Sequence, residues 1–282
     1  MTDAKRAPQP CLQGLAKFCG GRWPLAVVVL VTAATAACPA IGQVATDAPE
    51  AAALSGLVAE IADRHDDRDL ASDVLKWESD IAAFERRDAA EPDPDDAVLF
   101  LGSSSIRRWE TMAEDMRPWP TVRRGYGGSS YLDLLHYAPR LIAAHDPRAV
   151  VLFCGNDIKG AATDRTPEEM AALVEEVVRI VRDDDPNREV FVIEVTPTPQ
   201  RFAIWPQLSA ANDRIAAFCR RTPHTHFIGT RDIYLTKDGQ PDPSLFGDDD
   251  LHQNDDGYAR WAERIKRSLL AVLGSAQRKT PQ

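Results

Sequence analysis

Serine, histidine, aspartate and asparagine side chains recur in this chain at points where strands are predicted to end. Ser104 lies within GSSSI, residues 102–106, and His252 follows Asp249 by three residues. A carboxylate can accept a hydrogen bond from one imidazole nitrogen and leave the other nitrogen free as a base. A serine hydroxyl beside such a base can attack an acyl carbon. These residue types indicate nucleophilic acyl transfer, provided that the fold brings them together.

Two glycine-containing segments could supply hydrogen-bond donors for a developing oxyanion. Residues 124–130 (RGYGGSS) carry glycines, which let a backbone approach a ligand closely and expose its N–H groups. Residues 155–157 (GND) carry Asn156, whose side-chain amide can donate to an oxyanion. Each segment also has a plainer interpretation, a tight turn for the first and an Asx turn for the second. The first segment matches neither a Walker phosphate loop nor the GxGxxG of a dinucleotide fold.

Ser104 and His252 have plainer interpretations too. Serine is a preferred N-cap residue, and His252 lies in an acidic stretch, residues 248–256, that could be a solvated loop. Ca²⁺ binding by these aspartates is a further alternative, but the stretch lacks EF-hand spacing. The catalytic interpretation is favoured because all four segments fall at one edge of one predicted sheet and supply complementary roles.

Apolar strands and amphipathic helices are predicted to alternate along the chain. The predicted strands are 97–101, 120–123, 149–154, 189–195 and 226–229, and the predicted helices are 56–65, 69–88, 132–144, 167–182, 209–221 and 257–273. This alternation is typical of a mainly parallel sheet that is covered on both faces. Open sheets of this kind bind ligands at the carboxyl ends of their strands, where the four segments lie.

The composition excludes several classes of protein. The chain has 282 residues with 33 Lys plus Arg and 43 Asp plus Glu, and its formal net charge is −10. A charged fraction of 27% and a hydrophobic fraction of 44% are ordinary for a folded protein, which argues against a disordered, fibrous or multi-span membrane chain. The acidity argues against nucleic-acid binding, which uses clustered Lys and Arg.

The first 42 residues are typical of a targeting segment. An uncharged run at 24–37 follows four basic residues, and residues 40–42 (AIG) fit a small-x-small cleavage site. The basic residues are Lys5, Arg6, Lys17 and Arg22. The run is short for a spanning helix, although an uncleaved anchor over 24–42 stays open. We therefore expect an extracytoplasmic protein, periplasmic or secreted, with a membrane anchor as the alternative.

Four parts of the chain are predicted: residues 1–42 as signal peptide or anchor, 43–94 as a linker with a helical extension, 95–275 as the main domain, and 276–282 as a tail. Without residues 1–42, two cysteines remain, Cys154 and Cys219. Two cysteines are too few for a disulfide framework, and their spacing does not fit a zinc site. We expect no metal and no cofactor.

On these residues, the chain resembles the SGNH/GDSL hydrolase superfamily over roughly 95–272. The resemblance implies a flavodoxin-like three-layer α/β/α sandwich with a mainly parallel five-stranded sheet. It also implies a catalytic triad of nucleophile, base and orienting acid, and an oxyanion hole formed by two backbone N–H groups and one amide side chain. The triad positions are matched by Ser104, His252 and Asp249, and the oxyanion-hole positions by Ser104, Gly128 and Asn156.

The first block departs from the family pattern at one position. Ser103 stands where an aspartate is usual, so Ser103 and Ser105 remain alternatives to Ser104 as the nucleophile. The spacing from Gly102 and to Trp109 favours Ser104.

The third block also departs from the pattern, because Cys154 stands where a glycine is usual. We expect this side chain to narrow the pocket beside Asn156. Residues 196–206 (TPTPQRFAIWP) follow the fourth strand and reach the same edge, so Arg201 and Trp205 could line a substrate cleft, although loop packing explains them equally well. Trp109 is a third candidate for substrate binding.

Together with the targeting segment, the resemblance implies an exported serine esterase that hydrolyses a small acyl ester through an acyl-enzyme. Acetyl is a candidate acyl group, and a carbohydrate is a candidate alcohol. A thioesterase or lysophospholipase, an acyltransferase, and a non-catalytic cell-envelope binding protein of the same fold are alternatives. The expected partner is a small-molecule or glycan ester, with no nucleic acid and with membrane tethering only through the N-terminus.

Overall fold

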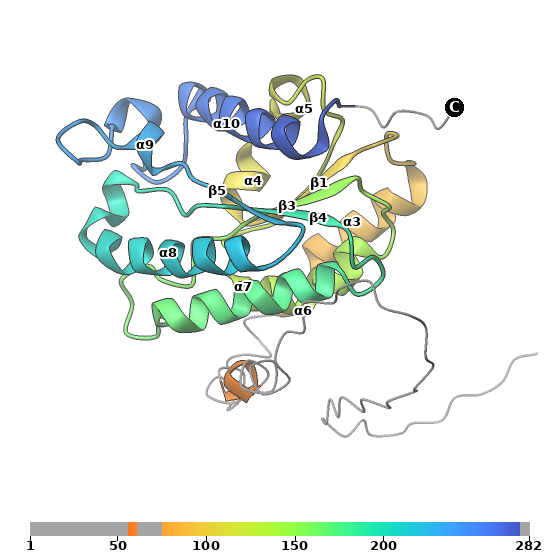
Figure 1. Cartoon of the computed structure of the whole chain (residues 1–282), viewed down its shortest axis with the longest axis horizontal. Coiled ribbons are helices and arrows are strands. Elements are labelled where there is room, and N and C mark those ends of the chain that lie inside the picture. Colours follow the sequence, from red (N-terminus) through yellow and green to blue (C-terminus); the bar gives the residue numbers. More distant parts are fainter. Residues whose placement is uncertain (1–55, 61–74, 277–282) are drawn as a thin grey trace, which may run out of the picture. The chain divides into compact units, whose positions relative to one another are not determined.

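The computed structural model describes residues 56–60 and 75–276, in which strands and helices alternate (Figure 1). The predicted targeting segment, most of the predicted linker and nearly all of the predicted tail lie outside the described residues. Within residues 56–60 and 75–276, no helix has both the length and the apolar character needed to cross a membrane.

Five strands form one sheet, and every neighbouring pair in it is parallel. The strands are β1 (Val98–Gly102), β2 (Thr121–Gly125), β3 (Ala149–Phe153), β4 (Glu189–Ile193) and β5 (Thr225–Ile228). Their order is β2-β1-β3-β4-β5, which is the flavodoxin-like order, so the predicted fold class is confirmed. In such sheets the crevice between β1 and β3, where the strand order reverses, is the expected ligand site.

Helices cover both faces of this sheet (Figure 1). One face carries α3 (Glu78–Ala90), α6 (Tyr131–Ile142), α7 (Pro167–Val181) and α8 (Trp205–Arg221). The other face carries α4 (Ser104–Arg108), α5 (Met112–Asp115), α9 (Arg231–Tyr234) and α10 (Asp255–Leu273). Two 3₁₀ helices, η1 (Pro199–Ile204) and η2 (Pro243–Leu245), complete the elements of residues 75–276, and residues 56–60 are helical as well.

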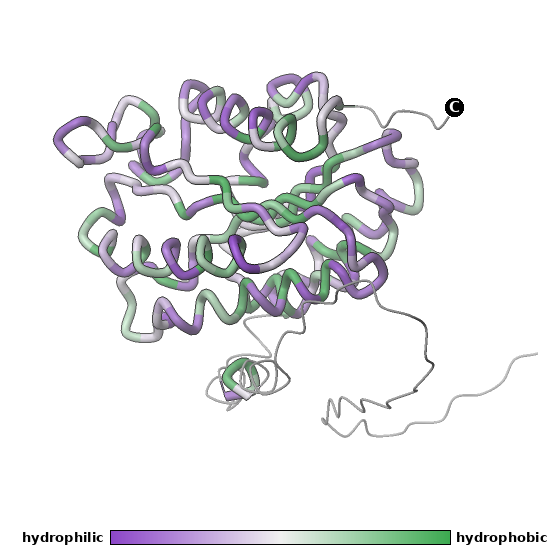
Figure 2. The backbone as a smooth tube through the Cα atoms, viewed as in Figure 1, coloured by the Kyte–Doolittle hydropathy of each residue, from purple (hydrophilic) through white to green (hydrophobic). Residues whose placement is uncertain are grey.

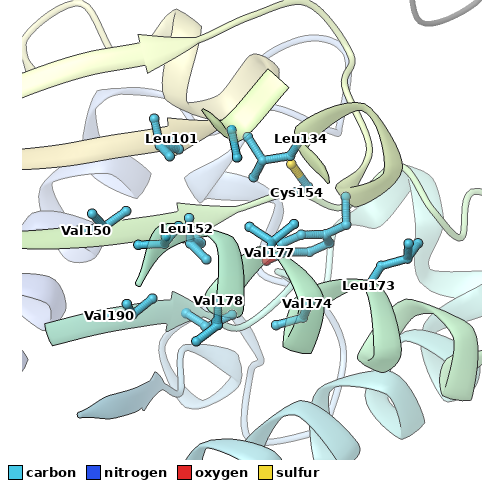
Figure 3. Packing of buried hydrophobic residues seen from close by; sticks show 14 of the residues in the cluster. Leu101, Leu134, Val150, Leu152, Cys154, Leu173, Val174, Val177, Val178 and Val190 are labelled. Carbon is cyan, nitrogen blue, oxygen red and sulfur yellow. The ribbon is translucent and has the colours of Figure 1, made fainter. Parts of the chain in front are cut away.

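Alternate strand residues supply the two cores of the molecule. In β1, Leu99 and Leu101 pack towards α6 and α7, whereas Val98 and Phe100 pack towards α10. The first of these cores is seen in Figure 3, where valines of α7 lie against Val150, Leu152 and Val190 of the sheet. Figure 2 shows the central strands as continuously apolar and the helices as two-sided. Burial on both faces explains why these strands are uninterrupted apolar runs.

The segment after β4 differs from the prediction. Residues 199–204 form η1, and α8 begins at Trp205 instead of at 209. Pro199 and Pro206 each occupy a first-turn position, where the fixed φ of proline favours helix and its missing N–H is not needed. Thr198 caps η1 by accepting a hydrogen bond from the N–H of Arg201 at 3.3 Å. Much of the predicted loop is therefore helical, with a kink at Arg201 between two short turns.

Candidate active site

The end of β1 sets the position of the serines. Gly102 lies so close to β3 that a Cβ there would come within 2.0 Å of the carbonyl oxygen of Phe153. The chain then turns into α4, for which Ser103 is the N-cap and Ser104 the first residue. Ser103 and Ser105 are buried, whereas the Oγ of Ser104 lies 2.8 Å from Nε2 of His252.

His252 is held between Ser104 and a carboxylate. Its Nδ1 lies 2.6 Å from Oδ2 of Asp249. The other oxygen, Oδ1, accepts the backbone N–H groups of His252 at 2.9 Å and of Leu251 at 3.1 Å. Because a carboxylate can only accept, Nδ1 carries the proton, and Nε2 is left as an acceptor for the Ser104 hydroxyl. The structure thus brings together Ser104, His252 and Asp249 in the order that a catalytic triad requires.

The environment of Asp249 keeps it ionised. Partial burial acts to raise its pKa, but the hydrogen bonds from His252 and Leu251 outweigh burial and hold the pKa well below its ordinary value. Arg108 adds an exposed ion pair, with Nη1 3.1 Å from Oδ2. An ionised Asp249 favours the imidazolium that forms when His252 takes a proton.

Asn156 follows β3 and reaches across to the loop that follows β2. Its Nδ2 donates to the carbonyl oxygen of Ser129 at 2.9 Å, so the side chain contacts a different loop instead of closing an Asx turn. Gly128 is adjacent, since a Cβ built on it would lie 3.9 Å from Nδ2. One Nδ2 hydrogen is used by Ser129, and the second can serve a ligand. This placement suits an oxyanion hole.

Asp157 is a site residue for which the sequence analysis gave no role. It is 1% exposed and accepts the N–H of Tyr131, the first residue of α6, at 2.9 and 3.2 Å. Burial raises its pKa to about 6, although Arg165 acts in the opposite direction. Together Asn156 and Asp157 hold the chain just after Gly128, at Ser129 and at Tyr131. The sequence Gly-Asn-Asp, in which Asp157 directly follows Asn156, is the signal from which Asp157 could have been predicted as a site residue.

A small cavity of about 30 Å³ lies between these groups. Ser104, Asn156 and His252 line it, with an apolar wall formed by Phe153, Val195 and Leu208. On the other side of His252 is an open groove of about 450 Å³, whose lining includes Arg108, Glu110, Asp248 and Asp255.

The expected substrate-binding residues lie in different places. Arg201 lines the small cavity, whereas Trp205 starts α8 beneath the guanidinium of Arg231, 5.7 Å from the ring centre, and is outside the cavity lining. Trp109 is fully buried, and its Nε1 donates to Asp115 at 2.7 Å, so it cannot meet a substrate. Trp109 belongs instead to the apolar core that lies under α4.

Cys154 acts differently from the expectation, and Tyr258 has a role for which the sequence analysis gave no prediction. Cys154 lies in the core on the opposite side of the chain from Phe153, because successive strand residues alternate, so it does not line the cavity. Tyr258 stacks on Trp109 with ring centres 5.4 Å apart and donates to the carbonyl oxygen of Ser105 at 2.9 Å. Tyr258 therefore holds the short helix α4 in place.

Metal ligands are not gathered in this region. Across residues 56–60 and 75–276, no cluster of three or more His, Cys, Asp or Glu side chains could hold a metal ion.

A flavodoxin-like sheet with serine, histidine and asparagine at its reversal point defines a hydrolase of the SGNH/GDSL type. The model of the GDSL-like lipase/acylhydrolase family matches residues 99–260, more than half of the chain, and the chain belongs to this family. By class it is an ester hydrolase, and the resemblance noted in the sequence is confirmed.

Individual relatives are distant in sequence. The platelet-activating factor acetylhydrolase IB subunit alpha1 of Pongo abelii is 23% identical over 195 residues, which are 67% of this chain and 82% of that protein. A structure from Streptococcus pneumonia, described as a candidate platelet activating factor, has a TM-score of 0.62 at 19% identity and covers 71% of this chain and 96% of its own. A GDSL-like lipase from Bacteroides thetaiotaomicron has a TM-score of 0.59 at 18% identity, with coverages of 68% and 97%. The structural likenesses concern the fold.

Proposed function

We propose that this protein is a serine esterase that removes a small acyl group, acetyl first of all, through an acyl-enzyme. The observation that carries the proposal is the continuous hydrogen-bonded series from Ser104 through His252 to Asp249, with distances of 2.8 and 2.6 Å. The family supplies the reaction class, and this series supplies a nucleophile with its base.

The mechanism has two halves. In the first, Oγ of Ser104 attacks the acyl carbon while Nε2 of His252 takes the hydroxyl proton, and Asp249 stabilises the imidazolium. The oxyanion is bound by the N–H groups of Ser104 and Gly128 and by Nδ2 of Asn156. His252 then gives the proton to the departing alcohol. In the second half, His252 removes a proton from water, which attacks the acyl carbon of the acyl-enzyme. The bond to Oγ of Ser104 then breaks as His252 returns the proton to that oxygen, and the carboxylic acid is released.

The size of the cavity supports a short acyl group. A volume of about 30 Å³ is roughly two to three times the 10–15 Å³ that one water molecule needs. The acetylhydrolase name of the Pongo abelii relative points the same way. A long acyl chain would need a larger apolar cavity, so this observation disfavours a lysophospholipase.

The open groove beyond His252 supports a polar alcohol. Its volume of about 450 Å³ and its charged lining can hold a hydroxyl-rich group such as a carbohydrate. Export is part of the proposal and is supported by the basic and apolar pattern of residues 1–42. N-terminal sequencing of the protein from a fractionated native host tests it, and an intact terminus in the cytoplasmic fraction would count against export.

The direct test compares the wild type with Ser104→Ala. We expect wild-type hydrolysis of p-nitrophenyl acetate and labelling by a fluorophosphonate, and near-background values for both with Ser104→Ala. Ser268→Ala is the matched control, because its hydroxyl bonds the Arg264 carbonyl within α10 and does not line the cavity at Ser104. Turnover and labelling that survive in Ser104→Ala would reject the proposed nucleophile.

A further inference from the structure

The guanidinium of Arg201 lies directly behind the amide of Asn156. Nη2 of Arg201 donates to Oδ1 of Asn156 at 2.9 Å, and Nη1 donates to the carbonyl oxygen of Gly155 at 2.7 Å. Arg201 thus holds both the backbone and the side chain of the third block. In sequence, Asn156 lies 45 residues and Gly155 46 residues before Arg201.

Two neighbours fix which end of the Asn156 amide points where. The carbonyl of Ser129 can only accept, so it requires the NH₂ end, and Arg201 can only donate, so it requires the oxygen end. If the amide turned over, an oxygen would face the carbonyl of Ser129 and the developing oxyanion. Arg201 therefore favours the orientation in which Asn156 is a donor.

Arg201 forms no ion pair within the part of the chain that the structure describes. Among residues 75–276, the structure gives it no carboxylate partner, and the acidic influence on it is the more distant charge of Asp164. Burial lowers its pKa, as expected for a cation moved away from water. A hydrogen bond from a cation polarises the amide and makes its N–H a stronger donor.

The segment that carries Arg201 is tied to the loop that carries the base. The N–H of Gln200 donates to the carbonyl oxygen of Asp250 at 3.0 Å, and Asp250 lies between Asp249 and His252. Thr198 caps η1 through the N–H of Arg201. The guanidinium is consequently positioned by a segment that is held by backbone hydrogen bonds at Gln200 and Arg201.

We propose that Arg201 is a positioning residue of the oxyanion hole, which orients and polarises the Asn156 amide and does not bind substrate. This inference rests on the proposed esterase function. It replaces the expectation from the sequence that Arg201 contacts the substrate.

The test is a double-mutant cycle with p-nitrophenyl acetate. We expect Arg201→Met to lower kcat about 10- to 100-fold, in line with a charge-assisted hydrogen bond, and to change KM less than about threefold. Asn156→Ala should lower kcat about 10²- to 10³-fold, and adding Arg201→Met to it should lower kcat no further. Arg214→Met on α8 is the matched control, since this exposed arginine bonds Glu168 and the carbonyl oxygen of Ala210 and does not line the cavity.

Three kinetic results would overturn the inference. They are losses that multiply in the double variant, a rise in KM with unchanged kcat, and an Arg201→Met variant as active as Arg214→Met. Melting temperatures of all variants identify a loss that comes from unfolding.

A second measurement does not depend on turnover. The side-chain NH₂ signals of Asn156 can be identified in ¹H–¹⁵N spectra by their loss in Asn156→Ala. We expect these signals to shift in Arg201→Met and to stay in place in Arg214→Met, and unchanged signals in Arg201→Met would refute the contact. A wild type that hydrolyses no ester would instead reject the proposed function, while the spectra still decide the contact.

Discussion

Asp249→Asn is the most informative change at the triad, because the surrounding backbone dictates how the new amide must lie. Oδ1 of Asp249 accepts two backbone N–H groups, from Leu251 and His252. An asparagine can satisfy both only by placing its oxygen there. Its NH₂ then faces Nδ1 of His252, where the carboxylate oxygen had been 2.6 Å away.

This orientation forces the wrong imidazole tautomer. An NH₂ group that donates to Nδ1 requires Nδ1 to be an acceptor, so the proton moves to Nε2. Nε2 then donates to Ser104 and cannot take its proton. In serine proteases with a buried carboxylate, such a change lowers kcat about 10⁴-fold. The side chain of Asp249 is 42% exposed, so solvent screens part of the effect, and we expect a loss of about 10²- to 10³-fold.

The assay is kcat with p-nitrophenyl acetate at neutral pH, with a melting curve to verify folding. Arg108→Met is the control, because it removes the other partner of Asp249 without changing the tautomer. That ion pair is exposed, with side-chain exposures of 50% and 42%, and contributes about 0–1 kcal/mol, or up to about fivefold in rate. An Asp249→Asn variant within fivefold of the wild type would refute the tautomer argument.

Three other outcomes are expected. The kcat/KM of p-nitrophenyl esters should fall at least about fivefold from acetate to butyrate, because overpacking the small cavity costs about 1–3 kcal/mol, and equal values would contradict the proposed acyl pocket. The pKa of Asp157 is raised to about 6, so as pH falls its carboxylate binds a proton in the folded state before it does in the unfolded state. Protonation of Asp157 should therefore increase the free energy of unfolding by about 1 kcal/mol from pH 7 to pH 5. Denaturant titrations of Asp157→Asn should lack this gain, and an equal gain in the variant would contradict the assignment. Gly127→Ala should lower the melting temperature, because the new Cβ would lie 1.8 Å from the ring of Trp77. In the double variant with Trp77→Ala, the fall in melting temperature should be smaller than the sum of the two single falls. Additive falls would count against this contact.

The strands were predictable because strands that are buried on both faces have uninterrupted apolar sequences. The prediction of 97–101 falls within one residue of β1, and 149–154 within one residue of β3, since both are apolar runs buried on two faces. The edge strand β5 was the weakest prediction, because its middle residues are only half-buried and its apolar pattern is short. Even so, the glycine that follows it marks its end within one residue.

The site was predictable as a set of residue types and not as a set of contacts. Ser104, Asn156 and His252 each follow a recognisable local pattern, and parallel topology brings strand ends to one edge. The roles of Arg201 and Trp109 were not predictable, because each depends on a partner far away in sequence. A flexible cation and a large aromatic ring fit a cleft, a core or a second loop equally well until packing decides.

The hold that Tyr258 has on α4 bears on when the protein becomes active during its synthesis. Helix α4 has five residues, too few to persist alone in water. Tyr258, which donates a hydrogen bond to Ser105 of this helix, lies 153 positions after Ser105 in the chain. The imidazole that contacts Ser104 is also added after the serine, at position 252. A nascent polypeptide that already contains the serine therefore lacks both the imidazole and the contact that holds α4 until residues 252–258 have been synthesised, and we expect it to be inactive up to that point.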